Sequence, residues 1–330
     1  MASTKYAFRI GNAAAALIAC IATVATAPAG AQDFPTKPVR LIVPQPPGGP
    51  TDMVARMVGE RLAQRWGQPV IVENKPGSGS NIGTDIVAKS APDGYTLVVA
   101  TLQHIVNPFM YPSLPFDPVK DFAPITLISR IDVVLVTNPS LPVKTLQDVV
   151  SYAKKNPGKL PWAFAGNGST GHLALELLQI SSGIDVIKVP YKGTQPALTD
   201  LLGGNVSAMF DGPGTSLQHI QAGKLRAIAS TGLKRHKLLP DVPTVAESGY
   251  PGFEAAGLAG LLAPAGTPPQ IVQKIQSDVA AIARSPDFEA KMSAMGYEIV
   301  ASTPAAYAEF MRTEAAKFGP LIRNANIKPE

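Results

Sequence analysis

Two glycine-rich loops hold the residue types best suited to binding an anion. The first spans residues 44–52 (PQPPGGPTD) and the second spans residues 165–172 (AGNGSTGH). Each follows an apolar run typical of a strand and precedes a run typical of a helix. The N–H groups that begin a helix are unpaired and lie at the positive end of its dipole, so both loops are predicted to attract an anion. A capped turn without a ligand is the alternative for each.

The second loop also admits two enzymatic interpretations. Gly166, Gly168 and Gly171 fit the G-x-G-x-x-G pattern of dinucleotide-binding folds, but the next predicted strand, 186–189, ends without the required acid. We therefore expect no cofactor. Ser169 could also act as a nucleophile with a nearby histidine as base. No G-x-S-x-G elbow surrounds this serine, so hydrolysis through Ser169 and His172 is kept only as an alternative.

Four further polar residues follow predicted strands, where ligand sites of α/β folds usually lie. Gln103 and His104 come after the run 96–100, and Tyr191 and Asp211 come after two later runs. Asp211 is interpreted either as a ligand contact or as an Asx-type turn residue. The histidines lack the spacing of a metal-binding motif, so we expect no metal site.

These loops require a repeated strand–loop–helix framework. Apolar runs at 39–43, 70–73 and 96–100 alternate with segments of helical periodicity, which predicts a parallel α/β sheet. The same alternation resumes between about 137 and 252, and amphipathic helices are predicted at 268–284 and 304–322. A chain of this length exceeds one ordinary hydrophobic core, so two domains are expected.

The N-terminus has the pattern of a secretory signal peptide. Lys5 and Arg9 precede an apolar segment at 13–27, and Ala29-Gly30-Ala31 provides a small-residue cleavage site. We therefore expect a signal peptide at 1–31 and a periplasmic protein. A lipoprotein anchored through Cys20 is the less favoured alternative.

Removal of this leader changes the charge and cysteine content. Lys and Arg fall from 29 to 27 against 24 Asp and Glu, so the net charge falls from +5 to +3. The only cysteine is lost with the leader. A mature chain with this weak charge and no dense basic run is not expected to bind nucleic acid, and it has no thiol for catalysis or metal binding.

The chain resembles the Bug receptors, the substrate-binding proteins of tripartite tricarboxylate transporters, over its whole mature length. The motifs that carry the resemblance are FPTKPVRLIVP (34–44), PGGPTD (47–52), VENKPG (72–77), NIG (81–83), APDGYTL (91–97), NP (107–108), DPVKDFAP (117–124), GNGS (166–169), VPYKG (189–193), ALTDLLGG (197–204), LPDVPTVAE (239–247) and LLAPAGTP (261–268).

The resemblance implies a two-domain periplasmic binding protein that closes on a solute like a flytrap, each domain being a mostly parallel sheet flanked by helices. One domain would comprise 32–130 plus 256–330, and the other 131–255. The implied function is a non-enzymatic receptor for a small organic carboxylate, such as a di- or tricarboxylate or terephthalate. The implied partners are the membrane components of the transporter, and a monomer is expected. An orphan sensor for a periplasmic signalling partner is a further alternative.

The resemblance also implies which residues hold the carboxylate. The residues carried over, together with those placed after strands above, are Pro47, Gly48, Gly49, Thr51, Gln103, His104, Asn167, Gly168, Ser169, Thr170, Tyr191 and Asp211. Some positions depart from the family pattern. Gln45 replaces an aromatic residue, Pro50 a third glycine, and Gly212 an asparagine, while the stretch 101–104 lacks its usual glycine. The carboxylate clamp is expected to be intact and the rest of the pocket altered.

Overall fold

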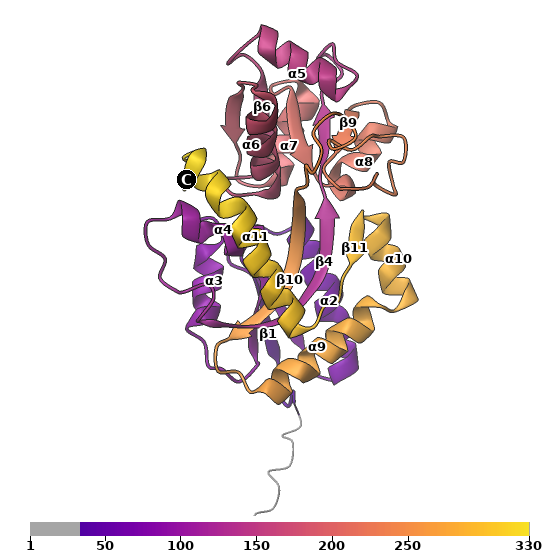
Figure 1. Ribbon diagram of the computed structural model, residues 1–330. Helices are drawn as coiled ribbons and strands as arrows, with labels where there is room; N and C mark the ends of the chain where they lie inside the picture. The colour runs from indigo at the N-terminus through magenta and orange to yellow at the C-terminus, as the bar shows by residue number, and fades with distance from the viewer. Residues whose placement is uncertain (1–33, 330) are drawn as a thin grey trace, which may run out of the picture. The chain divides into compact units, whose positions relative to one another are not determined.

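The computed structural model describes residues 34–329. From Lys37 onward the described chain forms one compact unit that contains two β-sheets, each flanked by helices (Figure 1). The predicted α/β class is therefore confirmed. The predicted signal peptide at 1–31 and the alternative lipidation of Cys20 lie outside the described residues.

The first sheet has the strand order β11-β4-β10-β3-β1-β2. Its strands are β1 (Val39–Val43), β2 (Val70–Asn74), β3 (Thr96–Ala100), β4 (Phe122–Asp132), β10 (Ala256–Pro264) and β11 (Tyr297–Ile299). Around it lie α2 (Pro50–Trp66), α3 (Asn81–Ala88), α4 (Leu102–Met110), α9 (Pro269–Ala283), α10 (Pro286–Ala294) and α11 (Pro304–Asn324). Strand β3 is buried throughout because apolar side chains point to both of its faces. We call this sheet with its helices the first lobe.

The second sheet has the order β7-β6-β8-β5-β9. Its strands are β5 (Val134–Thr137), β6 (Pro161–Phe164), β7 (Ile187–Pro190), β8 (Ala208–Asp211) and β9 (Arg226–Ser230). Its helices are α5 (Leu146–Lys155), α6 (Thr170–Ser182), α7 (Thr194–Gly203) and α8 (Pro213–Gln221). Leu135 packs into one apolar cluster, and Val134 and Val136 pack into another, as the two-residue repeat of a strand requires. We call this sheet with its helices the second lobe.

The sheets are mixed, which corrects the prediction that each is mostly parallel. Strands β1, β2 and β3 pair in parallel, as do β6, β7 and β8, but β10 runs antiparallel to β3 and β4, and β5 runs antiparallel to β8 and β9. The cause is the path of the chain between lobes. It leaves the first lobe through β4 and returns through β10, and these two long strands pair side by side (Figure 1).

The change of sheet between β4 and β5, and again before β10, falls close to the predicted domain limits. Those limits, 32–130 with 256–330 and 131–255, stay a prediction. Most predicted strands and helices are found within a few residues of their expected ends. Helix α4 was not predicted, and neither were α10 and β11.

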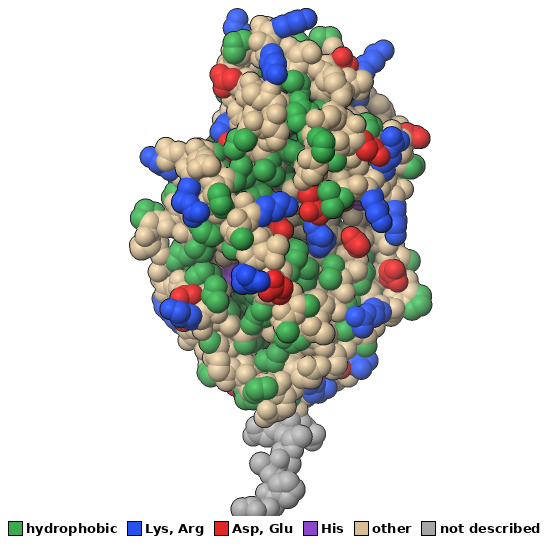
Figure 2. Space-filling model, viewed as in Figure 1, with side chains coloured by type: hydrophobic (Ala, Val, Ile, Leu, Met, Phe, Trp, Pro, Cys, Tyr) green, Lys and Arg blue, Asp and Glu red, His purple; other side chains and the backbone are tan. Residues whose placement is uncertain are grey.

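The described residues contain no helix that is both long and apolar enough to cross a membrane. On the face shown in Figure 2, basic and acidic side chains are interspersed over both lobes. This distribution agrees with the weak net charge read from the sequence.

Candidate functional site

A cavity of about 750 Å³ is lined by residues of both lobes. Within residues 34–329, six helices begin at its wall. Their N-cap residues all line the cavity: Gly49 (α2), Ser80 (α3), Thr101 (α4), Ser169 (α6), Gly193 (α7) and Gly212 (α8). Each N-terminus contributes unpaired N–H groups and a partial positive charge of about half a proton. The cavity is therefore electropositive without requiring a basic side chain.

Charged side chains are scarce around this cavity. In the described part of the chain only Lys192 and Asp211 carry a full charge among the lining residues, and Lys192 is solvent-exposed. An anion bound here would be held mainly by backbone N–H groups and by neutral hydroxyl and amide side chains.

The first glycine-rich loop is held by the buried carboxylate of Asp52. Its Oδ2 accepts hydrogen bonds from the Gly48 N–H (2.9 Å) and from Arg56 Nε (2.9 Å), and Asn74 Nδ2 donates to Oδ1 (2.8 Å). Burial acts to raise the pKa of Asp52, but these hydrogen bonds outweigh it and leave the pKa below its ordinary value. Asp52 thus fixes the loop and stays ionised.

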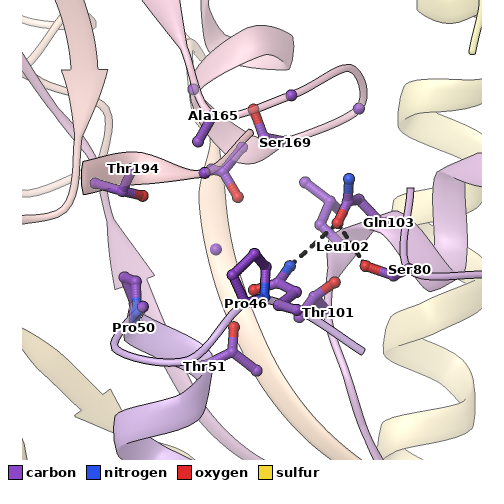
Figure 3. Close-up of a pocket in the computed structure, with 18 of the residues that line it drawn as sticks. Pro46, Pro50, Thr51, Ser80, Thr101, Leu102, Gln103, Ala165, Ser169 and Thr194 are labelled. Carbon is purple, nitrogen blue, oxygen red and sulfur yellow. Dashed lines mark hydrogen bonds between the residues drawn. The ribbon is translucent and has the colours of Figure 1, made fainter. Parts of the chain in front are cut away.

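This arrangement changes the roles expected in the first loop. Gly48 is not among the lining residues, and its N–H already donates to Asp52, which corrects its prediction as a ligand donor. Pro47 lines the cavity but has no N–H. Gly49 and Thr51 line the cavity, and Thr51 brings both an N–H of the first turn and a hydroxyl (Figure 3).

The second glycine-rich loop is shaped by the buried ring of His172. Its Nδ1 accepts from the Gly168 N–H (3.1 Å), its Nε2 lies 3.1 Å from Glu176 Oε1, and the ring stacks on Phe164 at 4.2 Å. Accepting at Nδ1 places the proton on Nε2. Burial acts to raise the pKa of Glu176, but hydrogen bonds from His172 and Lys188 leave it lowered. The N–H of Gly168 is therefore not available to a ligand.

The same geometry bears on the Ser169–His172 interpretation. Both ring nitrogens of His172 are engaged away from the serine hydroxyl, and Ser169 Oγ instead accepts the His172 backbone N–H (3.3 Å) as the cap of α6. A nucleophile needs a base within hydrogen-bond reach of its hydroxyl. The described contacts give His172 a structural role. Ser169 and Thr170 both line the cavity at the start of α6.

Asn167 lies where the two lobes meet. Its backbone carbonyl accepts a hydrogen bond from Gln103 Nε2 of α4 (3.1 Å), and its side-chain Nδ2 donates to the Lys328 carbonyl (2.9 Å). The amide nitrogen predicted to face a ligand is therefore directed to the C-terminal segment. Gln103 does line the cavity, as predicted, and it also links the lobes directly.

His104 is not a lining residue, which corrects its prediction as a ligand contact. It is the third residue of α4, and its ring lies against Phe122 (4.9 Å, edge-on) and parallel to Phe116 (6.4 Å). Nε2 lies 2.9 Å from the Pro118 carbonyl, and Nδ1 has no partner among the described residues. Burial lowers the pKa of His104 to about 4, so the ring is neutral.

Asp211 and Tyr191 both line the cavity. Asp211 accepts a hydrogen bond from Thr215 Oγ1 (2.6 Å), and burial raises its pKa to about 6. Asp211 thus borders the cavity and also bonds a side chain in the first turn of α8, and its interpretation as a ligand contact stays a prediction. Tyr191 donates its hydroxyl to Asp200 (2.6 Å), so it contributes its ring.

Several lining residues were not singled out from the sequence. Ser80 and Thr194 cap or begin helices at the cavity, and Tyr297 of β11 and Gly257 of β10 reach it from the C-terminal part of the chain. Thr194 begins α7 directly after VPYKG, so the strand–loop–helix pattern could have identified it. Tyr297 comes from a strand that was not predicted. None of the described His, Cys, Asp and Glu residues form a cluster able to hold a metal ion.

Comparison with known proteins gives one consistent result. A family model described as tripartite tricarboxylate transporter family receptor matches residues 54–327. Protein BugT of Bordetella pertussis is 37% identical over 304 residues, which cover 92% of this chain and 93% of BugT.

Solved structures extend the similarity to three dimensions. R. palustris Rpa4515 with adipate has a TM-score of 0.86 and 36% identity, covering 90% of this chain and 100% of that chain. MatC of Rhodopseudomonas palustris with bound malate has a TM-score of 0.81 and 33% identity, covering 88% and 100%. The two-sheet arrangement described above is the fold of these binding proteins.

Proposed function

The chain belongs to the tripartite tricarboxylate transporter receptor family, and on that premise we propose that it is a periplasmic receptor for a small organic carboxylate. It binds the carboxylate in the cavity between the lobes and delivers it to the membrane components of a tripartite transporter. The ligand belongs to the class of small organic acids that includes aliphatic di- and tricarboxylates, aromatic acids such as terephthalate, and amidated acids.

The observation that carries this proposal is the convergence of helix N-termini from both lobes on one cavity. Three helices of each lobe begin there, and the cavity wall has no arginine or buried lysine among the described residues. Such a wall favours a carboxylate over a cation, because each N-terminus stabilises a nearby anion by about 0.3–1 kcal/mol, and more where the site is partly buried.

Closure of the two lobes follows from the same arrangement. Thr51 and Gly49 contribute from the first lobe, and Ser169 and Thr170 from the second. A ligand that touches both sets has more contacts when the lobes are together, so it shifts the population toward the closed state by that difference in affinity. The relatives with adipate and malate support an organic acid as the ligand class.

Isothermal titration of the purified protein tests the ligand class. The panel contains adipate, malate, citrate and terephthalate, with phosphate and sulfate as inorganic anions. We expect at least one organic acid to bind and the inorganic anions to bind weakly or not at all. Binding of no organic acid, or turnover of a bound acid, would contradict the receptor proposal.

A matched pair of variants tests the site. Thr51→Val removes a hydroxyl from the cavity wall, and Thr199→Val removes one from the exposed surface of α7, outside the lining residues. A hydrogen bond to a charged group contributes about 1.5–3 kcal/mol, so Thr51→Val should weaken binding by about tenfold or more. Thr199→Val should bind like the wild type. Equal affinities for the two variants would place the ligand elsewhere.

Localisation and delivery need separate experiments. N-terminal sequencing of the exported protein should begin at Gln32, directly after the proposed leader. Cells that lack this protein should lose uptake of the acid that binds best in the panel. Normal uptake together with a lost transcriptional response to that acid would instead indicate the orphan sensor.

A further inference from the structure

Four polar side chains of the first lobe form one wall of the cavity: Gln45, Ser80, Thr101 and Gln103. Gln103 Oε1 accepts hydrogen bonds from Gln45 Nε2 (3.1 Å) and from Ser80 Oγ (2.8 Å), as the dashed lines in Figure 3 show. Thr101 lies on the same side of the cavity (Figure 3). We call these four residues the polar wall.

The bonds within the polar wall leave a definite set of groups without partners. The carbonyl oxygen of Gln103 has two lone pairs and both are used, and one of its N–H groups donates to the Asn167 carbonyl. Gln45 uses one N–H, so its Oε1 and its second N–H have no partner among the described side chains and backbone. The polar wall therefore presents both an acceptor and a donor to the cavity.

Thr101 supplies an independent observation. The residue is only 7% exposed, and its Oγ1 is buried without a hydrogen-bond partner within the described chain. A buried hydroxyl without a partner costs folding free energy. Thr101 lines the cavity, so its unpartnered hydroxyl lies at the wall that a bound ligand would contact.

All four side chains of the polar wall are uncharged. The two charged lining residues of the described chain, Lys192 and Asp211, both belong to the second lobe.

Ser80 also holds a left-handed backbone conformation (φ 78°), which is uncommon outside glycine. Strain of this kind is often retained where a side chain must be aimed, and here it accompanies the bond to Gln103.

We propose that Gln45 and Thr101 are specificity-determining residues that bind an uncharged polar substituent, a hydroxyl or a carboxamide, on the carboxylate ligand. The proposal rests on the carboxylate receptor function. A hydroxyl or carboxamide both donates and accepts, which matches the free groups of Gln45 and the hydroxyl of Thr101. A hydrocarbon substituent would leave these groups buried without partners, and a second carboxylate can only accept.

Matched ligands test this selectivity by isothermal titration. Succinamate is compared with its apolar isostere 4-methylpentanoate and with succinate, and adipamate is compared with adipate to allow for a longer ligand. Hydroxy acids, 2-hydroxybutanoate and 4-hydroxybutanoate, are compared with butanoate. We expect the best amide or hydroxy acid to bind at least tenfold more tightly than its apolar counterpart and than the corresponding dicarboxylate.

Variants connect the selectivity to the two residues. Thr101→Val and Gln45→Met keep the side-chain size, and each should reduce the preference for the polar ligand to less than threefold. The polar ligand loses a hydrogen-bond partner, and the apolar acid no longer buries an unpartnered polar group. Thr199→Val, outside the cavity, should retain the full preference. The melting temperature of ligand-free Thr101→Val should equal or exceed that of the wild type, because the unpartnered hydroxyl is gone.

The outcomes separate this proposal from the receptor function. If acids bind but the apolar or dicarboxylate member is preferred, or if the variants weaken all acids equally, the polar wall does not determine specificity. A lowered melting temperature of Thr101→Val with unchanged selectivity would give Thr101 a purely structural role. If no carboxylate in the panel binds, the receptor function fails, and this proposal fails with it.

Discussion

Replacing His104 with glutamine should change how the stability of the protein depends on pH. In the folded protein the pKa of His104 lies at about 4, because burial disfavours the charged ring. In the unfolded chain it lies at about 6.5. Below pH 6.5, His104 therefore binds a proton in the unfolded state but not in the folded state. The free energy of unfolding falls as the pH falls toward 4.

The magnitude follows from the difference between the two pKa values. Each pKa unit corresponds to about 1.4 kcal/mol, so acidification from pH 7.5 to pH 4.5 removes about 2–3 kcal/mol through this single group. Glutamine does not titrate, and its amide can still donate to the Pro118 carbonyl that His104 contacts. The variant should be less stable than the wild type at pH 7.5, because it loses the contacts with Phe122 and Phe116. That deficit should shrink by about 2–3 kcal/mol at pH 4.5.

Urea unfolding followed by circular dichroism at the two pH values measures this change. Phe116→Leu is the matched control, since it disturbs the same aromatic cluster and keeps the histidine. It should be destabilised at both pH values and should keep the wild-type pH dependence. A stability difference between wild type and His104→Gln that stays constant, or that widens in acid, would refute the reasoning.

Two further predictions concern the second lobe. A Cβ atom on Gly171 would lie 2.6 Å from the Phe210 carbonyl oxygen, so Gly171→Ala should displace the start of α6, destabilise the protein by about 1–3 kcal/mol and abolish ligand binding in titration. Gly203→Ala, whose nearest contact would be 3.7 Å away, should be neutral or stabilising in thermal unfolding. Burial raises the pKa of Asp211 to about 6, so its contribution to stability is present below about pH 4 and is lost as the pH rises through 6. Relative to the wild type, Asp211→Asn should therefore gain about 2–3 kcal/mol between pH 4 and pH 7.5, and an unchanged difference in urea unfolding at these two pH values would contradict this assignment.

The position of the cavity could be predicted from the sequence because it depends on local patterns. A strand followed by a glycine-rich loop and a capped helix places the loop at the carboxyl end of the sheet. Gly49, Thr51, Ser169 and Thr170 line the cavity for that reason.

Which backbone N–H groups of the two glycine-rich loops are free to bind a ligand could be predicted only in part. Gly48 and Gly168 donate to the side chains of Asp52 and His172, each four residues further along the chain. A polar side chain in the first turn of a helix competes with a ligand for the N–H groups before it. This spacing is visible in the sequence, and it is a usable signal in other loops of this kind.

The orientation of His104 and the arrangement of the strands needed the tertiary structure. Helix α4 contains Pro108, and a proline inside a segment argues against predicting a helix there. Without that helix, His104 was expected to face the cavity beside Gln103, whereas it points into the aromatic cluster. The antiparallel β10 was likewise not predictable from a local strand–helix alternation, since its partners β3 and β4 lie far away in the sequence.

The place of β10 in the first sheet also limits the order in which the parts of the chain can fold. It lies between β3 and β4, yet Ala256–Pro264 is synthesised long after both of them. Until then β3 and β4 have no strand between them, and their apolar edges stay unpaired. The second lobe, made entirely from the intervening chain, can assemble first. The first sheet, and with it the finished cavity, can therefore be completed only when the last quarter of the chain is available to pair.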